Sequence, residues 1–318
     1  MSEIKMSKKM KIIYAGTPGF AVPPLEAIVQ AGHEVVLVIT QPDRVNARGG
    51  KISISPVKKT ALTLGLPVFQ PEKINTEKSI SQLREYEANY LVTAAYGQIL
   101  KEEVLALPKN GCVNIHASLL PQLRGAAPIH RAVMSGMNQS GITIMEMDKG
   151  MDTGDIILQR ATEILPTMTA GELHDVLSVL GAEMIVDFLA DAENSWAAKQ
   201  KQNDAEASIA AKIQKKELFV DFNNDAKILY NKIRGLSPVP AARCMLDGKV
   251  LKIYESQTVD WSKGARPGEI VAFDAKKGFI AKAANNALRL KQVQIEGKKR
   301  LEDTQFVIGY NKKDSILM

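Results

Sequence analysis

Several features that the sequence lacks narrow the class of protein. It has only two cysteines, Cys112 and Cys244, and no Cys-x-x-Cys pair, which excludes a disulfide scaffold and argues against structural zinc. No apolar run approaches the roughly 18 residues that a membrane helix needs. The basic start at residues 1–10 is not followed by an apolar segment, so we predict no signal peptide and expect a cytoplasmic protein with reduced thiols.

The glycine signatures of common nucleotide-binding and hydrolase folds are also missing. The chain contains no G-x-G-x-x-G, no G-x-x-x-x-G-K-[ST] and no G-x-S-x-G. The missing dinucleotide fingerprint argues against a nicotinamide dehydrogenase. The first predicted turn, residues 16–20, reads Gly-Thr-Pro-Gly-Phe. It fits a tight strand-to-helix turn at least as well as it fits a ligand-binding loop.

The charge of the chain is modest in total and uneven along its length. The 318 residues contain 41 Lys and Arg against 35 Asp and Glu, a net charge of +6. Residues 1–207 hold 20 basic and 23 acidic residues, a net −3, whereas residues 208–318 hold 21 and 12, a net +9. The basic last third either meets a polyanion or presents a solubilising lysine-rich surface, and charge alone does not choose between them.

Short apolar runs alternate with helical patterns along the first part of the chain. Residues 11–15, 34–40 and 90–95 are predicted as buried strands, and residues 21–31 as a helix with prolines in its first turn. This alternation is typical of βαβ units with a parallel sheet. We therefore predict an α/β, Rossmann-like domain with a mostly parallel sheet over residues 8–195.

The composition changes after residue 195. Residues 196–214 are rich in Ala, Lys, Gln and Asn with little periodicity, which predicts a linker. Closely spaced strand-like runs follow, separated by turn signals such as Asp247-Gly248. They predict a smaller, OB-like β-barrel domain over residues 215–318.

Two polar side chains end one of the predicted strands. Asn114 and His116 are two residues apart, so they share a face at the carboxyl end of the strand, where ligands bind in open α/β sheets. An amide donates a hydrogen bond to a developing oxyanion, and an imidazole transfers a proton near neutral pH. The alternative is a histidine whose hydrogen bonds are satisfied in the core.

A carboxylate beside an imidazole fixes the tautomer of the imidazole. One Gly-containing loop offers three candidate carboxylates. Asp148, Asp152 and Asp155 lie in this loop between two predicted strands. The chemistry of the sequence does not choose among the three. A solvated turn is the alternative, since Asp and Gly are common in turns.

With these residues in place, the chain resembles the methionyl-tRNA formyltransferase family, whose members use 10-formyltetrahydrofolate. The resemblance runs from about residue 10 to the C-terminus and is thin beyond about residue 215. The matching stretches are residues 15–21, 40–44, 55–58, 114–121, 124–129 and 147–155. The longest of them are shared with other folate formyltransferases, so alone they do not fix the acceptor of the formyl group.

The resemblance implies roles for individual residues. Those that match the catalytic residues of the family are Asn114, His116 and Asp152. Those that match its folate-contacting loop are Ser118, Leu119, Leu120 and Pro121. Those in the loop that reaches the acceptor end of the tRNA are Arg44, Arg48 and Lys51. The basic C-terminal barrel matches a second tRNA-binding surface.

Two departures from the family pattern are visible. Ala117 stands where many relatives have Gly, a change that matters only if a positive φ is needed there. The loop at residues 44–48 lacks the proline that some relatives have.

The implied activity is formyl transfer from 10-formyltetrahydrofolate to the α-amine of methionyl initiator tRNA, giving N-formylmethionyl-tRNA for translation initiation. Asn114 and His116 would stabilise the oxyanion, and His116, held by Asp152, would move the proton. We expect a monomer that needs no metal and no membrane. A formyltransferase for a small-molecule amine and a non-catalytic RNA-binding protein remain as alternatives.

Overall fold

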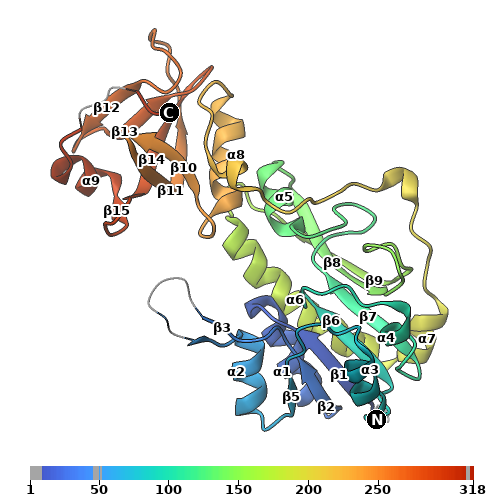
Figure 1. Cartoon of the computed structure of the whole chain (residues 1–318). Coiled ribbons are helices and arrows are strands. Elements are labelled where there is room, and N and C mark those ends of the chain that lie inside the picture. The colour runs from blue at the N-terminus through green and yellow to red at the C-terminus, as the bar shows by residue number, and fades with distance from the viewer. Residues whose placement is uncertain (1–8, 46–49, 51, 313–315) are drawn as a thin grey trace, which may run out of the picture. The chain divides into compact units, whose positions relative to one another are not determined.

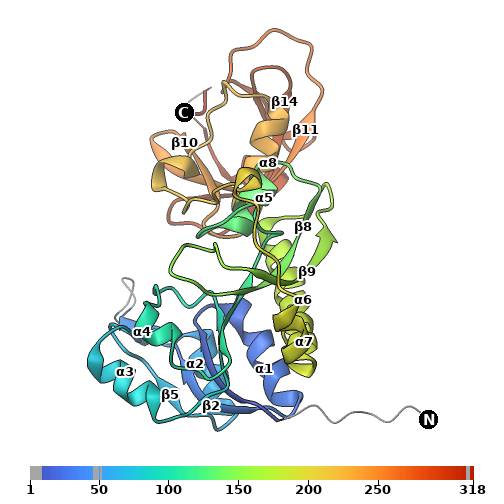
Figure 2. The same cartoon turned by 90° about the vertical axis from the view of Figure 1, so that its right-hand side faces the viewer.

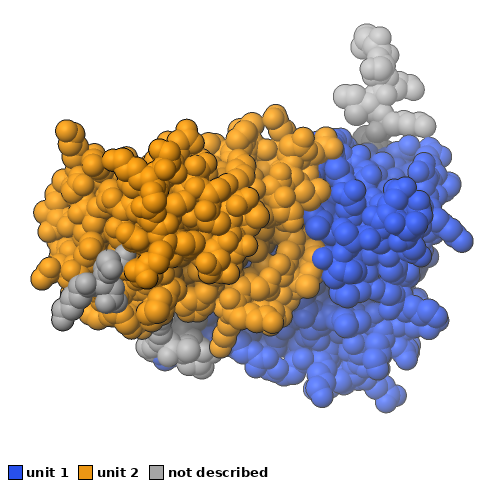
Figure 3. Space-filling model, turned by 90° about the horizontal axis from the view of Figure 1, so that it is seen from above, with its two compact units in different colours: residues 1–125, 140–162, 174–209 blue, residues 126–139, 163–173, 210–318 orange. Residues whose placement is uncertain are grey.

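The computed structural model describes residues 9–45, 50, 52–312 and 316–318 (Figure 1). The chain divides into two compact units, which Figure 3 colours separately. Unit 1 comprises residues 1–125, 140–162 and 174–209, and unit 2 comprises residues 126–139, 163–173 and 210–318. The stretch predicted as a linker is divided between them, since residues up to 209 belong to unit 1.

Unit 1 is built on a seven-stranded sheet. In spatial order its strands are β5 (Val68–Phe69), β2 (Glu34–Ile39), β1 (Lys11–Gly16), β6 (Tyr90–Ala94), β7 (Gly111–His116), β8 (Gln139–Glu146) and β9 (Ile156–Glu163). The strands from β5 to β7 pair in parallel, and β8 is antiparallel to β7. The predicted mostly parallel, Rossmann-like sheet is confirmed. The strand order reverses between β1 and β6, which favours a ligand crevice beyond their carboxyl ends.

Helices cover both faces of this sheet, as the side view in Figure 2 shows. They are α1 (Val22–Gln30), α2 (Pro56–Thr63), α3 (Glu77–Arg84), α4 (Glu102–Leu105), α6 (Ala170–Ala190) and α7 (Ala192–Ala197). Residues of α3 and α4 pack in one cluster with Ile13, Leu37 and Leu91. On the other face, the ring of Tyr90 lies 5.3 Å from that of Phe188 in α6. Because successive strand residues face opposite sides and helices cover both, β1, β2 and β6 are mostly apolar, which is the continuous pattern that the sequence shows.

Local signals set several helix ends. The hydroxyl of Ser55 accepts a hydrogen bond from the Lys58 amide at the start of α2, and Thr76 does the same for Ser79 at the start of α3. Helix α1 ends at Gln30, and Gly32, two residues further on, has a φ of 85°.

The predicted polar loop of residues 41–56 contains a short antiparallel hairpin. Strand β3 (Arg44–Val45) pairs with β4 (Ile52–Ser53). Two-residue strands are too short to show a period-2 pattern, which is why the sequence did not predict them.

Unit 2 contains an antiparallel β domain with helices packed on it. The sheet order is β10 (Ala242–Leu246), β11 (Lys249–Val259), β14 (Ala287–Ile295), β13 (Gly278–Lys282) and β12 (Ile270–Asp274). Strand β15 (Leu301–Glu302) pairs with β14 and leads into α9 (Asp303–Gly309). Helix α8 (Ala226–Leu236) contacts α5 (Pro128–Met134) so closely that a Cβ on Gly235 would lie 2.5 Å from the Met134 side chain. The predicted C-terminal β domain is confirmed.

The last residues of the chain join the two edges of this β domain. The amide of Leu317 donates to the carbonyl of Gly268, before β12, at 2.8 Å. Met318 exchanges two backbone hydrogen bonds with Met245 of β10, at 2.5 and 3.2 Å. Because β10 and β12 are the ends of the sheet path, these bonds close it in the manner of a barrel.

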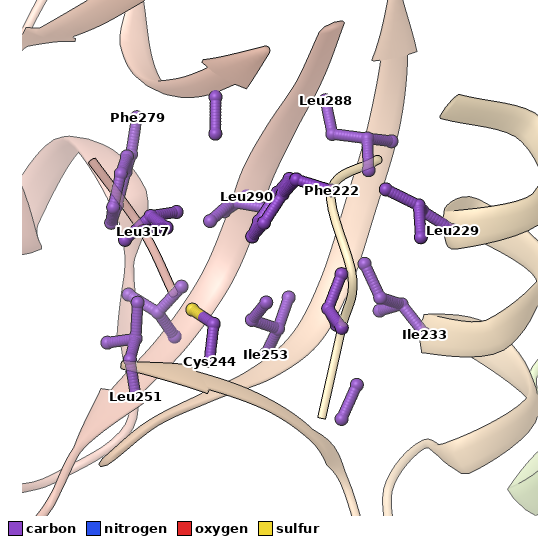
Figure 4. Packing of buried hydrophobic residues seen from close by; sticks show 14 of the residues in the cluster. Phe222, Leu229, Ile233, Cys244, Leu251, Ile253, Phe279, Leu288, Leu290 and Leu317 are labelled. Atoms are coloured by element: carbon purple, nitrogen blue, oxygen red, sulfur yellow. The ribbon is translucent and has the colours of Figure 1, made fainter. Parts of the chain in front are cut away.

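A large apolar cluster lies inside unit 2 (Figure 4). Leu229 and Ile233, one turn apart on α8, point into it beside Phe222 and Leu290. Cys244 lies in the same cluster, and burial raises the pKa of its thiol to about 12.

The other cysteine, Cys112 of unit 1, is also buried and forms no disulfide, and burial raises the pKa of its thiol to about 12. Both thiols therefore act as small apolar residues.

Candidate active site

The loops after three strands are tied together at the carboxyl edge of the sheet in unit 1. The hydroxyl of Thr17, after β1, donates to the carbonyl of Tyr96, after β6, at 2.9 Å. The side-chain amide of Gln41, after β2, donates to the same carbonyl at 3.2 Å. A Cβ on Gly16 would lie 2.6 Å from the Cβ of Ala21. The first turn thus needs glycine for close packing, which supports its interpretation as a tight strand-to-helix turn.

Asn114 lies near the end of β7 with its carboxamide anchored from one side. Thr93, its partner in register on β6, donates its hydroxyl proton to Asn114 Oδ1 at 2.8 Å. Since Oδ1 is the acceptor in this bond, the amide nitrogen is left as a donor. Among the described residues no hydrogen bond of that nitrogen is found, and the side chain is partly buried. The amide is therefore free to donate to a bound molecule.

His116 is buried, with contacts at both ring nitrogens. Its Nε2 lies 3.0 Å from the carbonyl oxygen of Leu123. A carbonyl only accepts, so Nε2 must have the proton. Nδ1 faces Asp152, at 3.6 Å from Oδ1. The tautomer is thus fixed through Nε2, and Nδ1 is the nitrogen that a proton can leave or join.

The structure distinguishes the three acids of the loop before β9. Asp152 contacts His116 and accepts a hydrogen bond from the amide of Gly125 at 2.8 Å. Asp148 instead accepts from Gly150 and Thr153 within its own loop. Asp155 lies 3.8 Å from the ammonium of Lys199. Of the three, Asp152 is the one that the fold brings to the imidazole.

The predicted folate-contacting loop, Ser118 to Pro121, is held by bonds within unit 1. Ser118 donates to the carbonyl of Gln122 at 2.6 Å. The Thr143 hydroxyl donates to the carbonyl of Ser118 at 2.7 Å and accepts from the amide of Leu120 at 3.1 Å. Ser118 and Leu120 are buried by the chain's own contacts, whereas the side chains of Leu119 and Pro121 are partly exposed.

The three residues predicted to contact tRNA are only partly placed. Arg44 forms an ion pair with Glu72, with 2.8 Å between Nη2 and Oε2, and both side chains are exposed. Arg48 and Lys51 lie outside the described residues.

Two residues that the sequence did not predict as site residues also contact this site. Arg124 and Gln202 form a hydrogen-bonded pair, with Arg124 Nε 2.9 Å from Gln202 Oε1, and Gln202 also contacts the backbone of Asp152. The Arg124-Gly125 pair stands out in the loop after His116 as a charged residue beside a glycine. Gln202 gives no signal, because it is one polar residue in a polar stretch.

The described part of the chain holds neither a metal-binding cluster nor a membrane-spanning helix. Residues 9–45, 50, 52–312 and 316–318 contain no group of three or more His, Cys, Asp or Glu side chains that could hold a metal ion. No described helix is both long and apolar enough to cross a membrane.

Family models match both parts of the chain. Residues 8–189 match the formyl transferase model, and residues 212–311 match the model of the formyl transferase C-terminal domain. A methionyl-tRNA formyltransferase of Moorella thermoacetica is 44% identical over 95% of this chain and 96% of its own. One of Ruminiclostridium cellulolyticum is 41% identical over 96% of this chain and 98% of its own.

Solved structures of lower identity share the fold. HypX from Aquifex aeolicus in complex with tetrahydrofolic acid is 17% identical, with a TM-score of 0.65 over 96% of this chain and 49% of its own. An N-formyltransferase from Helicobacter canadensis, with folinic acid and dTDP-3-aminofucose, is 20% identical, with a TM-score of 0.62 over 88% of this chain and 98% of its own. The family models and the relatives at above 40% identity establish that this chain belongs to the formyl transferase family, among the methionyl-tRNA formyltransferases.

Proposed function

We propose that the chain transfers the formyl group of 10-formyltetrahydrofolate to the α-amine of methionyl initiator tRNA. The observation that supports this most is the group formed by Asn114, His116 and Asp152 at the carboxyl edge of the sheet. It lies in a chain that matches relatives named methionyl-tRNA formyltransferase along nearly their whole length. The same relatives are the reason to prefer a tRNA acceptor to a small amine.

The proposed chemistry uses the hydrogen bonds already present. The amine nitrogen bonds to the formyl carbon, the bond from that carbon to the folate nitrogen breaks, and one proton passes from the amine to that nitrogen. The amide nitrogen of Asn114, left free by the bond to Thr93, donates to the oxygen on which charge develops. Nδ1 of His116 transfers the proton, and Asp152 stabilises the imidazolium that forms.

The remaining predicted residues have binding roles in this proposal. The partly exposed side chains of Leu119 and Pro121 offer apolar surface to the ring system of a folate, while Ser118 and Leu120 shape the loop. Arg44 exchanges its exposed partner Glu72 for a tRNA phosphate. In the loop of residues 44–51, the residues proposed to contact tRNA are Arg44, Arg48 and Lys51.

The domain division and setting are proposed with the function. Residues 8–195 form the catalytic domain, 196–214 the linker and 215–318 a basic, tRNA-binding domain with a barrel-like sheet. The match of residues 212–311 to the C-terminal domain model supports the last of these. We propose that the protein is a monomer. We also propose that it is located in the cytoplasm, since initiator tRNA is charged in the cytoplasm.

An acceptor comparison tests the proposal. The chain is incubated with 10-formyltetrahydrofolate and, in parallel, with methionyl initiator tRNA, methionyl elongator tRNA and a small amine such as an amino sugar nucleotide. We expect formylation of the initiator tRNA at the highest kcat/KM. Faster transfer to the small amine would replace the tRNA acceptor, and tRNA binding without transfer to any acceptor would favour the non-catalytic RNA-binding alternative.

A further inference from the structure

Both partners of His116 lie on short segments that are bonded to a third. Leu123, which accepts from Nε2, has its own amide 2.9 Å from the Ser208 hydroxyl. The next residue, Arg124, donates its backbone amide to the carbonyl of Ser208 at 2.9 Å. Residues 202–208 therefore hold the segment that fixes one side of the imidazole.

The same third segment holds the loop on the other side of the imidazole. The amide nitrogen of Gln202 donates to the carbonyl of Asp152 at 2.8 Å and to that of Gly154 at 2.7 Å. Its oxygen accepts from Arg124 Nε at 2.9 Å. Both protons and the oxygen of this carboxamide are thus used, and they link residue 124 to the loop of Asp152.

Arg124 is itself held in place by its environment. Its side chain is only 8% exposed, and its charge is paired with Asp204 at 2.8 Å. A buried guanidinium without partners is unfavourable, so its hydrogen bonds strongly restrict its position. Gln202 therefore accepts from a donor that does not move freely.

The backbone at both contacts of His116 has an unusual conformation. Leu123 has a φ of 60° and Asp152 a φ of 57°, in the left-handed region that side chains other than Gly seldom adopt. Such residues persist where surrounding structure holds them, and they occur preferentially at functional sites. Hydrogen bonds from residues 202–208 reach the backbone of both residues.

We propose that Gln202, with Arg124, is a positioning residue for the reaction, acting through Asp152 on His116. This rests on the proposed function for its effect on catalysis, but not for its effect on the imidazole. Gln202 holds the carbonyls on either side of residue 153, so that the carboxylate of Asp152 stays directed at Nδ1 and Gly125. The segment predicted as a linker thereby completes the site.

The first test observes the imidazole without any substrate. Ring-nitrogen NMR signals of His116 are assigned by their loss in His116→Gln and compared in Gln202→Met and in Asp152→Asn. We expect the Nδ1 signal in Gln202→Met to move toward its position in Asp152→Asn, and the Nε2 signal to move less. Gln200→Met is the matched control, since Gln200 is exposed and pairs with Ile156 through its backbone only. An unchanged Nδ1 signal in a folded Gln202→Met overturns the proposal.

The second test is a double-mutant cycle in the formylation assay. Gln202→Met is expected to lower kcat about 10- to 100-fold with both KM values little changed, as for other residues that orient a reacting group. In an Asp152→Asn background the same change should cost less than about twofold, because the group it positions is gone. A full loss in both backgrounds means that Gln202 acts on stability alone and overturns the proposal.

The two tests fail separately. A chain that formylates no tRNA refutes the proposed function, and the NMR comparison still decides whether Gln202 positions Asp152. If Gln202→Met does not fold, Arg124→Lys, which keeps the charge but not the Nε donor to Gln202, is used in both experiments with the same expected results.

Discussion

Replacing Asn114 by Ala should separate catalysis from folding. The change removes the amide donor that we assign to the oxyanion, which should cost about 3–4 kcal/mol of transition-state stabilisation, or about 10²- to 10³-fold in kcat. The structural cost is small, because Thr93 keeps Val113 O and Met147 Sδ, both at 3.3 Å, as alternative acceptors. We expect the free energy of unfolding to fall by only about 1 kcal/mol.

The assay for Asn114→Ala measures single-turnover formyl transfer to methionyl initiator tRNA, with tRNA binding followed separately by filter retention. Thr93→Val is the matched variant, since it keeps the amide but removes its anchor at 2.8 Å. It should lower kcat less than Asn114→Ala, about tenfold, because a misplaced donor still donates part of the time. Turnover of Asn114→Ala close to that of the parent chain, with the protein folded, would refute the oxyanion role.

Three further predictions concern stability and tRNA binding. Hydrogen bonds from the side chain of Arg131 and the backbone of Gln214 hold the pKa of Glu217 at about 2, below its ordinary 4.5. Because the pKa is lower in the folded state, the ionised carboxylate stabilises the fold fully above about pH 4.5. This contribution to stability is lost as the pH falls toward 2. Because the pair is partly exposed, denaturation should show a loss of about 1–2 kcal/mol over that window that Glu217→Gln lacks. Gly16→Ala should lower the free energy of unfolding by about 1–3 kcal/mol, measured by urea denaturation, since the added methyl meets Ala21 at 2.6 Å. The affinity for tRNA should fall steeply with salt, with a log–log slope that lysine-to-glutamine changes in residues 208–318 reduce; a slope that they leave unchanged would place the phosphate contacts elsewhere.

The fold of unit 1 could be predicted because the residue pattern of its strands indicates that they are buried. Strand β6, for example, is buried at all five positions, and its run of apolar residues already indicates a parallel strand covered on both sides. The closure of the β domain in unit 2 could not be predicted in the same way. It depends on Leu317 and Met318 pairing with residues about 50 and 70 positions away, and two residues are too few to show a periodic pattern.

The candidate site divides along similar lines. Asn114 and His116 were predictable, because a strand repeats its faces every second residue. The choice of Asp152 from three acids depends on a loop with a left-handed residue, which no local pattern specifies. Gln202 lies 50 residues further along and acts through backbone carbonyls, so its residue type gave no indication of its contacts.

The most direct test of the central claim follows a labelled formyl group. The chain, in excess over methionyl initiator tRNA, is mixed with 10-formyltetrahydrofolate labelled in the formyl carbon, and the aminoacyl ester is hydrolysed and analysed. The account predicts that the label appears on the α-nitrogen of methionine, and that Asn114→Ala slows its appearance by about 10²- to 10³-fold. Label that remains on the folate or is released as formate, with folded protein and bound tRNA, would contradict it.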